Sequence, residues 1–250
     1  LAFNTSQELF IYDGDDPELS LWAKYQNFTQ DSGAFASITA INGSIYCGQA
    51  ASTAAYSGNG YFQLNFAADY FFSNIISIFS THRQGRADGL LTSYNYKPRG
   101  DRTTPKYVLV AYQVADIAMT VLPNAPIDAD TGLPVPTIAV ATDGGVSVIK
   151  DNGTVVDIVS SYLNHETPMQ VKFVGDRVFW LGQNNYDNGW SSAFTVKIPN
   201  ADLSVNYNSG VGSLTKYSSK EWSVHLTNGS DISIPIAMNS PRTSVLIETG

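Results

Sequence analysis

The sequence predicts an all-β fold: a β-propeller-like array of antiparallel hairpins that repeat along the chain. Short β-branched runs are separated by two-residue turns of the Asn-Gly and Asp-Gly type, and helical periodicity is nearly absent. Hairpins also recur, with starts near residues 37, 88, 137, 171 and 222. Most of these starts are about 50 residues apart, which is the length of one four-stranded propeller blade. A β-sandwich with Greek-key connections is the alternative.

The hairpin turns are the most specific local signal. Their residues supply the positive φ angles that type I′ turns require. The turns are Asn42-Gly43, Asp143-Gly144, Asn152-Gly153, Gly175-Asp176 and Asn228-Gly229. Strands are expected on their flanks, over residues 37–41, 44–47, 137–141, 146–149, 154–158, 171–174, 177–181, 222–226 and 232–234.

Two segments are candidates for helices. Residues 67–79 are rich in aromatic and β-branched side chains, so they favour a strand plus a turn over a helix. Residues 157–164 leave a short helix open.

A Pro-rich connection at residues 123–136 interrupts the pattern with Pro123, Pro126, Pro134 and Pro136. Proline fixes φ and has no backbone donor, so a stiff, extended segment is expected here. Strands of the same style lie on both sides. We therefore expect residues 1–250 to form a single β-repeat domain, in which this segment joins neighbouring repeats.

Charge and composition exclude several classes of partner. The net charge of −8 argues against nucleic acid, which requires a basic surface, and against an anionic membrane surface. No apolar run approaches the about 18 residues of a membrane-spanning helix. Cys47 is the one cysteine, so no internal disulfide is expected and a buried thiol is. The chain begins at Leu1 rather than Met, which indicates a piece of a longer protein.

No pattern of a catalytic or metal centre is present. His82, His165 and His225 are scattered without metal-ligand spacing. The Gly-x-Ser-x-Gly elbow, the phosphate loop and the dinucleotide fingerprint are absent from the sequence. We therefore expect no catalytic residue, no metal and no cofactor.

Two acidic segments are the places where a glycosidase could hide, because such enzymes need two carboxylates about 5–10 Å apart. The first contains Asp13, Asp15, Asp16 and Glu18 in a Gly/Pro turn, where aspartates are ordinary turn formers. The second, Asp128-x-Asp130-x-Gly132, starts like a calcium loop but lacks the third acid and the distant glutamate. We expect both segments to be turns.

An aromatic, amide-rich loop is the better functional lead. Sugars bind by stacking an apolar face on Trp or Tyr while amides and carboxylates hold their hydroxyls. The loop after Gln183 has this composition, and the segment 56–61 has a similar one. The predicted ligand-binding residues are Asn184, Asn185, Tyr186, Asp187 and Trp190.

The stretch Asp130–Ile158, with its Gly-Val-Ser-Val-Ile strand followed by Asp-Asn-Gly, resembles propeller-like repeats of bacteriophage tail-fibre and tail-appendage proteins. Ile11-Tyr12-Asp13-Gly14 with Leu21-Trp22, and Ile38–Gly48, resemble the opening of the same kind of region.

The resemblance implies a structural or adhesive virion component in an extracellular tail, with a homo-oligomeric assembly and other tail proteins as partners. A host surface glycan is the ligand it implies for an adhesin. It supplies no catalytic residue. The alternatives are a polysaccharide-degrading enzyme, with Asp13, Asp15, Asp128 or Asp187 among its acids, and a non-viral secreted lectin-like propeller.

Overall fold

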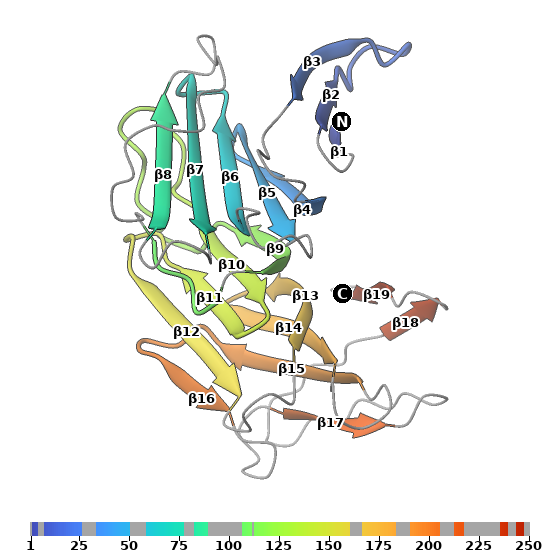
Figure 1. The fold of residues 1–250 in the computed structure, drawn as a ribbon, viewed down its shortest axis with the longest axis vertical. Helices are drawn as coiled ribbons and strands as arrows, with labels where there is room; N and C mark the ends of the chain where they lie inside the picture. The colour runs from blue at the N-terminus through green and yellow to red at the C-terminus, as the bar shows by residue number, and fades with distance from the viewer. Residues whose placement is uncertain are drawn as a thin grey trace.

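The computed structural model describes residues 2–4, 8–26, 34–50, 59–77, 83–89, 107–111, 113–160, 167–183, 191–205, 213–217, 236–239 and 244–247. The regular secondary structure of these residues is entirely β (Figure 1). The all-β prediction is confirmed. The closed ring of a propeller stays a prediction.

The first two sheets are simple meanders. The first has the order β1 (Ala2–Asn4), β2 (Glu8–Tyr12), β3 (Leu21–Gln26). The second runs β4 (Ala34–Ile41), β5 (Ser44–Ala50), β6 (Asn59–Asn65), β7 (Tyr70–Ser77), β8 (Arg83–Gly89). Every neighbouring pair in both sheets is antiparallel.

The third sheet comprises β9 (Val114–Thr120), β10 (Thr137–Thr142), β11 (Gly145–Ile149) and β12 (Val155–Ser160), with β16 (Leu203–Val205) added parallel to β12. The fourth comprises β13 (Thr167–Val174), β14 (Arg177–Gln183), β15 (Ser191–Lys197) and β17 (Ser213–Tyr217). A last hairpin pairs β18 (Ile236–Asn239) with β19 (Ser244–Ile247).

The first four sheets pack face to face in chain order, and a hydrophobic core lies between each sheet and the next. The first core joins Leu9 and Ile11 to Ile45 and Cys47. The second joins the opposite face of β5–β6 to the third sheet, through Tyr46, Tyr61, Ile117, Ile138, Val140 and Ile149. The third packs β9–β12 on β13–β15, through Val146, Val148, Val178, Trp180 and Phe194. Figure 1 shows the second, third and fourth sheets one after another from top to bottom.

This stacking explains why some strands are apolar throughout. Every residue of β10 and β11 is buried, because their alternate side chains enter the second and the third core. A strand buried on both faces loses the alternation of a half-exposed strand.

The predicted turns form where the sequence places them. Asn42 and Gly43 have φ angles of 50° and 69° between β4 and β5. Gly153 and Gly175 also have positive φ angles, and Asp143-Gly144 connects β10 to β11. The turn Asn228-Gly229 lies outside the described residues.

Both segments considered as helix candidates contain strands in the structure. Residues 66–69 form a turn and β7 follows, so a turn and a strand stand here in place of a helix, with the turn before the strand. The short helix left open at 157–164 is wrong for residues 157–160, which continue β12 because Val156 and Ile158 alternate into the third core. Residues 161–164 are outside the described part of the chain.

The Pro-rich connection differs from its prediction. Residues 123–136 link β9 to β10 inside one sheet, so they do not join neighbouring repeats. They also double back on themselves: Ile127 pairs with Pro134, Asp128 N donates to Leu133 O (2.9 Å) and Val135 N to Pro126 O (2.8 Å). The segment folds as a hairpin because its non-proline residues supply the donors that the prolines lack. We call residues 126–135 the proline hairpin.

The predicted repeat of about 50 residues does not coincide with the boundaries of the sheets either. The second, third and fourth sheets begin at Ala34, Val114 and Thr167, whereas the predicted starts near 88 and 137 fall at the end of β8 and on β10. A type I′ signal marks any antiparallel connection, so it cannot distinguish the first strand of a sheet from a later one.

A β-bulge recurs in the first strand of three successive sheets. Ala36 in β4, Ala115 in β9 and Met169 in β13 each stand opposite no partner residue. A bulge leaves backbone groups outside the ladder, so they need other partners.

After the bulges in β9 and β13, a side chain of the preceding sheet accepts a backbone hydrogen bond. Ser37, just after the first bulge, accepts a hydrogen bond from Ile117 N (3.2 Å) and donates to Asp116 Oδ1 (2.5 Å). Asp116, just after the second bulge, accepts from Val171 N through Oδ2 (2.9 Å). We call this chain of contacts the bulge tie. It joins β4, β9 and β13, the edge strands of three sheets, in series.

Candidate functional site

The loop predicted to bind a ligand, Asn184, Asn185, Tyr186, Asp187 and Trp190, lies outside the described residues and stays a prediction. It connects β14 to β15. The three histidines lie outside them as well. In the described part of the chain, no group of three or more His, Cys, Asp or Glu residues is arranged to hold a metal ion. Those same residues contain no helix long and apolar enough to cross a membrane.

The first acidic segment is a turn, as predicted. Asp13 Oδ1 accepts from Asp15 N (2.9 Å), and Asp16 accepts from the backbone of Glu18 and Ser20 and from the Ser20 hydroxyl. The Ser20 hydroxyl, followed by these backbone donors, lowers the pKa of Asp16. These carboxylates are occupied in shaping the connection between β2 and β3.

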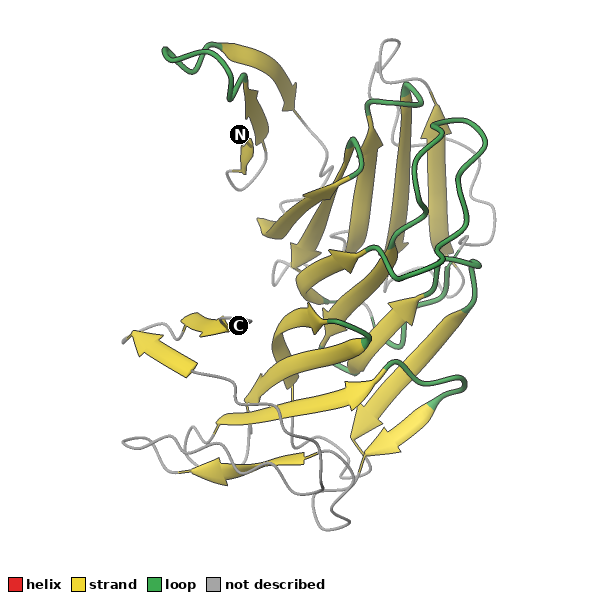
Figure 2. Ribbon diagram, turned by 180° about the vertical axis from the view of Figure 1, so that it is seen from behind, coloured by secondary structure: helices red, strands yellow, loops and turns green. Residues whose placement is uncertain are grey.

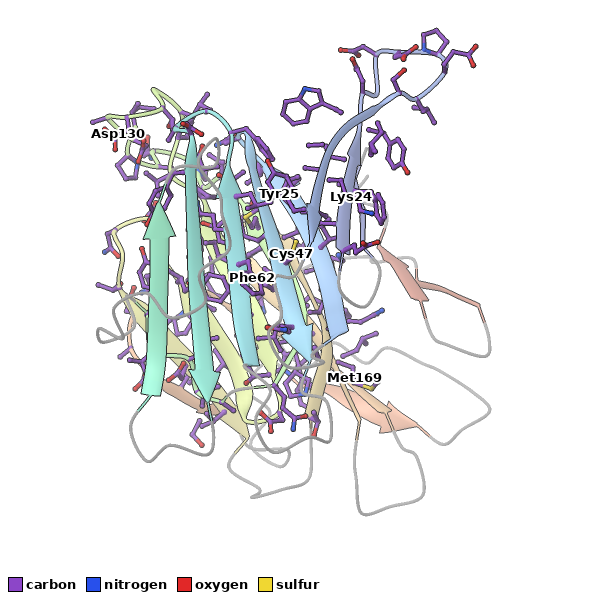
Figure 3. All side chains as sticks on the ribbon, turned by 45° about the horizontal axis from the view of Figure 1, so that its top comes forward. Lys24, Tyr25, Cys47, Phe62, Asp130 and Met169 are labelled. Carbon is purple, nitrogen blue, oxygen red and sulfur yellow. The ribbon has the colours of Figure 1, made fainter. Side chains whose placement is uncertain are left out.

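The second acidic segment is a turn too. Asp128 Oδ1 accepts from Asp130 N (3.1 Å), from Thr131 N (2.9 Å) and from Thr131 Oγ1 (3.0 Å). This bonding closes the tip of the proline hairpin. Asp130 is exposed at that tip (Figure 3), while Asp128 is half-buried and faces a cavity.

That cavity lies between the second and third sheets, beneath the proline hairpin, and has a volume of about 140 Å³. We call it the inter-sheet pocket. One wall is the polar end of β5–β6, with Ser44, Tyr46, Gln63 and Asn65. The facing wall is the cross-strand pair Ile138 and Ile149, continued by Lys150 and Asp151 of the next turn. Tyr107 and the hairpin residues Asp128, Thr131, Leu133 and Pro134 complete it.

Local sequence explains the two walls. Ser44 pairs with Asn65 and Tyr46 with Gln63 across the β5–β6 ladder, so their side chains share the face toward the third sheet. Nearer the middle of that face Tyr46 stacks on Tyr61, with ring centroids 5.9 Å apart. The polar residues begin where the second core ends. The pocket is therefore the open end of that core.

The Asn42 side chain holds the proline hairpin over the pocket. Its Nδ2 donates to Pro134 O at 2.7 Å, across 92 residues of sequence. The hairpin reaches from the third sheet toward the second, along the loops drawn green in Figure 2. Asn42 thus serves twice, in the type I′ turn and as the anchor of the hairpin.

Both apolar and polar side chains line the pocket. Tyr46 is 5% exposed, and burial, followed by Tyr107 and Tyr70, raises its pKa far above the ordinary range. Its phenol is therefore neutral and acts as a hydrogen-bonding group. The charged side chains of the rim are Asp128, Lys150 and Asp151, all half-buried.

Of the residues that line the pocket, the sequence indicated Asp128 as a candidate catalytic acid and did not indicate the others as site residues. Asn42 was identified only as a turn residue, and no signal marked Gln63, Lys150 or Asp151. Their common feature is spatial, since the pocket gathers residues from segments 42–65, 107, 128–138 and 149–153. No protein-family model matches the chain, and no curated protein shows a significant match to it.

Proposed function

We propose that the chain is a non-enzymatic structural or adhesive component of a bacteriophage tail that binds a host surface glycan in the inter-sheet pocket. The pocket is the observation that carries this proposal. It combines the apolar side chains of Ile138 and Ile149 and the ring of Tyr46 with amides, hydroxyls and carboxylates. Ligand sites of this kind use the apolar surface for affinity and a few polar groups for orientation.

The pocket residues match the two surfaces of a sugar ring. Tyrosine rings and prolines pack against C–H faces, while side chains such as Gln63 and Asn65 exchange hydrogen bonds with hydroxyls. A chain with only 14% charged residues offers little competing ionic attraction, which suits a neutral polar ligand.

The resemblance to tail proteins supports the biological setting. The resembling stretch Asp130–Ile158 forms β10, β11 and most of β12 and contributes one wall of the pocket. In this setting the chain assembles as a homo-oligomer with other tail proteins in an extracellular virion appendage. A non-viral secreted lectin-like protein would use the same pocket in a different location.

A polysaccharide-degrading enzyme is the second candidate, because Asp128 and Asp151 line the same pocket. The bonding of Asp128 favours adhesion instead. Its Oδ1 accepts three hydrogen bonds from its own turn and so holds the proline hairpin in shape. Asp13 and Asp15 belong to the connection between β2 and β3 and are not among the pocket residues.

Incubation of the purified chain with host capsule or lipopolysaccharide tests the proposal. We expect the chain to be retained on the immobilised polysaccharide and no oligosaccharide to be released into solution. Release of oligosaccharide would favour the enzyme. A blank result with the polysaccharides and on a broad glycan array would refute glycan binding altogether.

A further inference from the structure

We infer that the inter-sheet pocket binds one uncharged six-membered sugar ring, the terminal residue of its glycan, and discriminates against acidic sugars. This inference rests on the proposed function, since it takes the ligand to be a glycan. It adds the size of the bound unit, its charge and the two side chains that set the preference, Lys150 and Asp151.

The volume of the pocket sets the size of the ligand. At about 140 Å³ it is close to the cavity of about 150 Å³ that admits a benzene ring. A pyranose ring with its hydroxyl groups is larger than benzene, so the pocket holds at most one sugar ring, and a disaccharide exceeds it. The proline hairpin closes one side through the Asn42–Pro134 hydrogen bond, so a long chain cannot pass straight through. A terminal ring inserted end-on meets both conditions.

The charges at the rim set the charge of the ligand. The pocket is lined by two carboxylates, Asp128 and Asp151, and one ammonium group, Lys150. Their sum is one negative charge, and the whole chain carries −8. A uronic or sialic acid would bring another carboxylate into this partly desolvated rim, where like charges repel more strongly than in water. An uncharged ring avoids that repulsion.

Lys150 and Asp151 are placed to hold hydroxyls. They follow β11 at the start of the turn that Gly153 N closes on Lys150 O (2.9 Å). Within the described part of the chain, neither side chain takes part in an ion pair. The Lys150 ammonium group offers donors and the Asp151 carboxylate offers acceptors to neighbouring sugar hydroxyls. Because the two charges are opposite, each partly cancels the other at the rim.

Two matched pairs of ligands and two variants with opposite changes of charge test the inference. The full chain is titrated calorimetrically with the methyl glycosides of glucose and galactose, and with the methyl glycosides of glucuronic and galacturonic acid. We expect at least one neutral glycoside to bind, and at least tenfold more tightly than its uronate.

The variants should move this preference in opposite directions. Asp151→Asn removes one negative charge, so the ratio between neutral and acidic ligand should fall at least threefold. Lys150→Gln removes the positive charge, so the ratio should rise. Asp130→Asn, at the exposed tip of the same hairpin, is the matched control and should leave the ratio unchanged. Unchanged thermal unfolding of each variant separates these effects from misfolding.

No binding of either neutral glycoside, equal or tighter binding of the uronates, or the same ratio in all variants would overturn this inference. Binding on the glycan array together with any of these results leaves glycan adhesion standing and removes only the pocket preference. A blank array removes the proposed function itself, so the two failures are distinguishable.

Discussion

Gly48 on β5 sets how closely the second and third sheets approach. A Cβ atom built there would lie 2.6 Å from Val114 Cγ1 and 3.4 Å from Ile117 Cδ1, both on β9. Real carbon atoms do not approach to the first distance, so the β9 side chains occupy the space that the missing side chain leaves. The tight start of the second core depends on this glycine.

We expect Gly48→Ala to lower the free energy of unfolding by about 1–3 kcal/mol, the usual cost of overpacking a core. Urea denaturation measures the change. The double variant Gly48→Ala/Val114→Ala should lose less than the two single variants added together, because the second substitution removes the atom in conflict. Additive losses would show that the clash is relieved elsewhere.

Cys47, the neighbour of Gly48, faces the first core. It is 2% exposed, and burial raises the pKa of its thiol to about 12. Figure 3 shows it within the molecule, close to Phe62. We expect no reaction with a thiol reagent at pH 8 in the folded chain and full reaction in denaturant, since the thiolate is the reactive form. Rapid labelling without denaturant would contradict the packing of the first sheet on the second.

The sequence predicted the buried state of Cys47 because the neighbouring Ile45 and Tyr46 form an apolar run. It could not predict the role of Gly48, because the atoms that require a glycine there belong to Val114 and Ile117, far along the chain. Local composition reports burial, and it does not report which distant residue comes close.

At the level of strands, the bulge tie is the feature that links neighbouring sheets through specific hydrogen bonds. Both carboxylate oxygens of Asp116 are used, Oδ1 by Ser37 and Oδ2 by Val171 N. An asparagine has the same shape but only one acceptor oxygen, so Asp116→Asn leaves one of these donors without its partner.

We expect Asp116→Asn to lower the free energy of unfolding by about 1–3 kcal/mol, the cost of an unpaired part-buried polar group. Chemical denaturation is again the measurement. Asp130→Asn, an exposed control of the same chemistry, should stay within about 0.5 kcal/mol of the unaltered chain. If both variants behave alike, the bulge tie does not stabilise the stack.

Asp157, on β12, makes the stability of the third sheet sensitive to pH. Desolvation, with a further contribution from Asp202, raises the pKa of Asp157 above its ordinary value of 3.8, although its hydrogen bond from Ser147 Oγ (2.6 Å) acts in the opposite direction. The folded state therefore holds this proton more tightly than the unfolded state. Ionisation of Asp157 as the pH rises through the raised pKa consequently disfavours folding.

Asp157→Asn removes that ionisation while keeping an acceptor for Ser147. We expect the variant to gain stability relative to the unaltered chain as the pH rises from 4 to 7. Urea denaturation of both proteins at the two pH values gives the difference. A difference that is constant or that falls over this range would contradict the raised pKa.

The positions of the hairpin turns could be predicted from the sequence, but the assignment of each strand to a sheet could not. Asn42-Gly43 and Gly175-Asp176 form hairpins because asparagine and glycine readily adopt a positive φ, as Asn42, Gly43 and Gly175 do. The proline hairpin was mispredicted because its fold depends on donors such as Asp128 N and Val135 N, which prolines counted alone do not reveal. The bulges left no recognisable residue pattern.

At the scale of the whole molecule, successive sheets pack on one another and separate at one end to leave the inter-sheet pocket. The all-β class followed from the turns and the β-branched runs. The pocket could not be predicted, because it exists only where Asn42 meets Pro134 and where β5–β6 faces Ile138 and Ile149. The binding loop predicted at residues 184–190 rests on its composition alone and stays a prediction.

Localising the bound sugar tests most directly whether the inter-sheet pocket is the binding site. Isotope-labelled chain is titrated with the methyl glycosides of glucose, galactose and N-acetylglucosamine while its backbone amide resonances are followed. We expect at least one glycoside to shift the amides of residues 42–46, 63–65, 128–133, 135 and 150–153, which surround the pocket. Shifts confined to Asn184–Trp190, or no shift with any of the three, would contradict binding in the inter-sheet pocket.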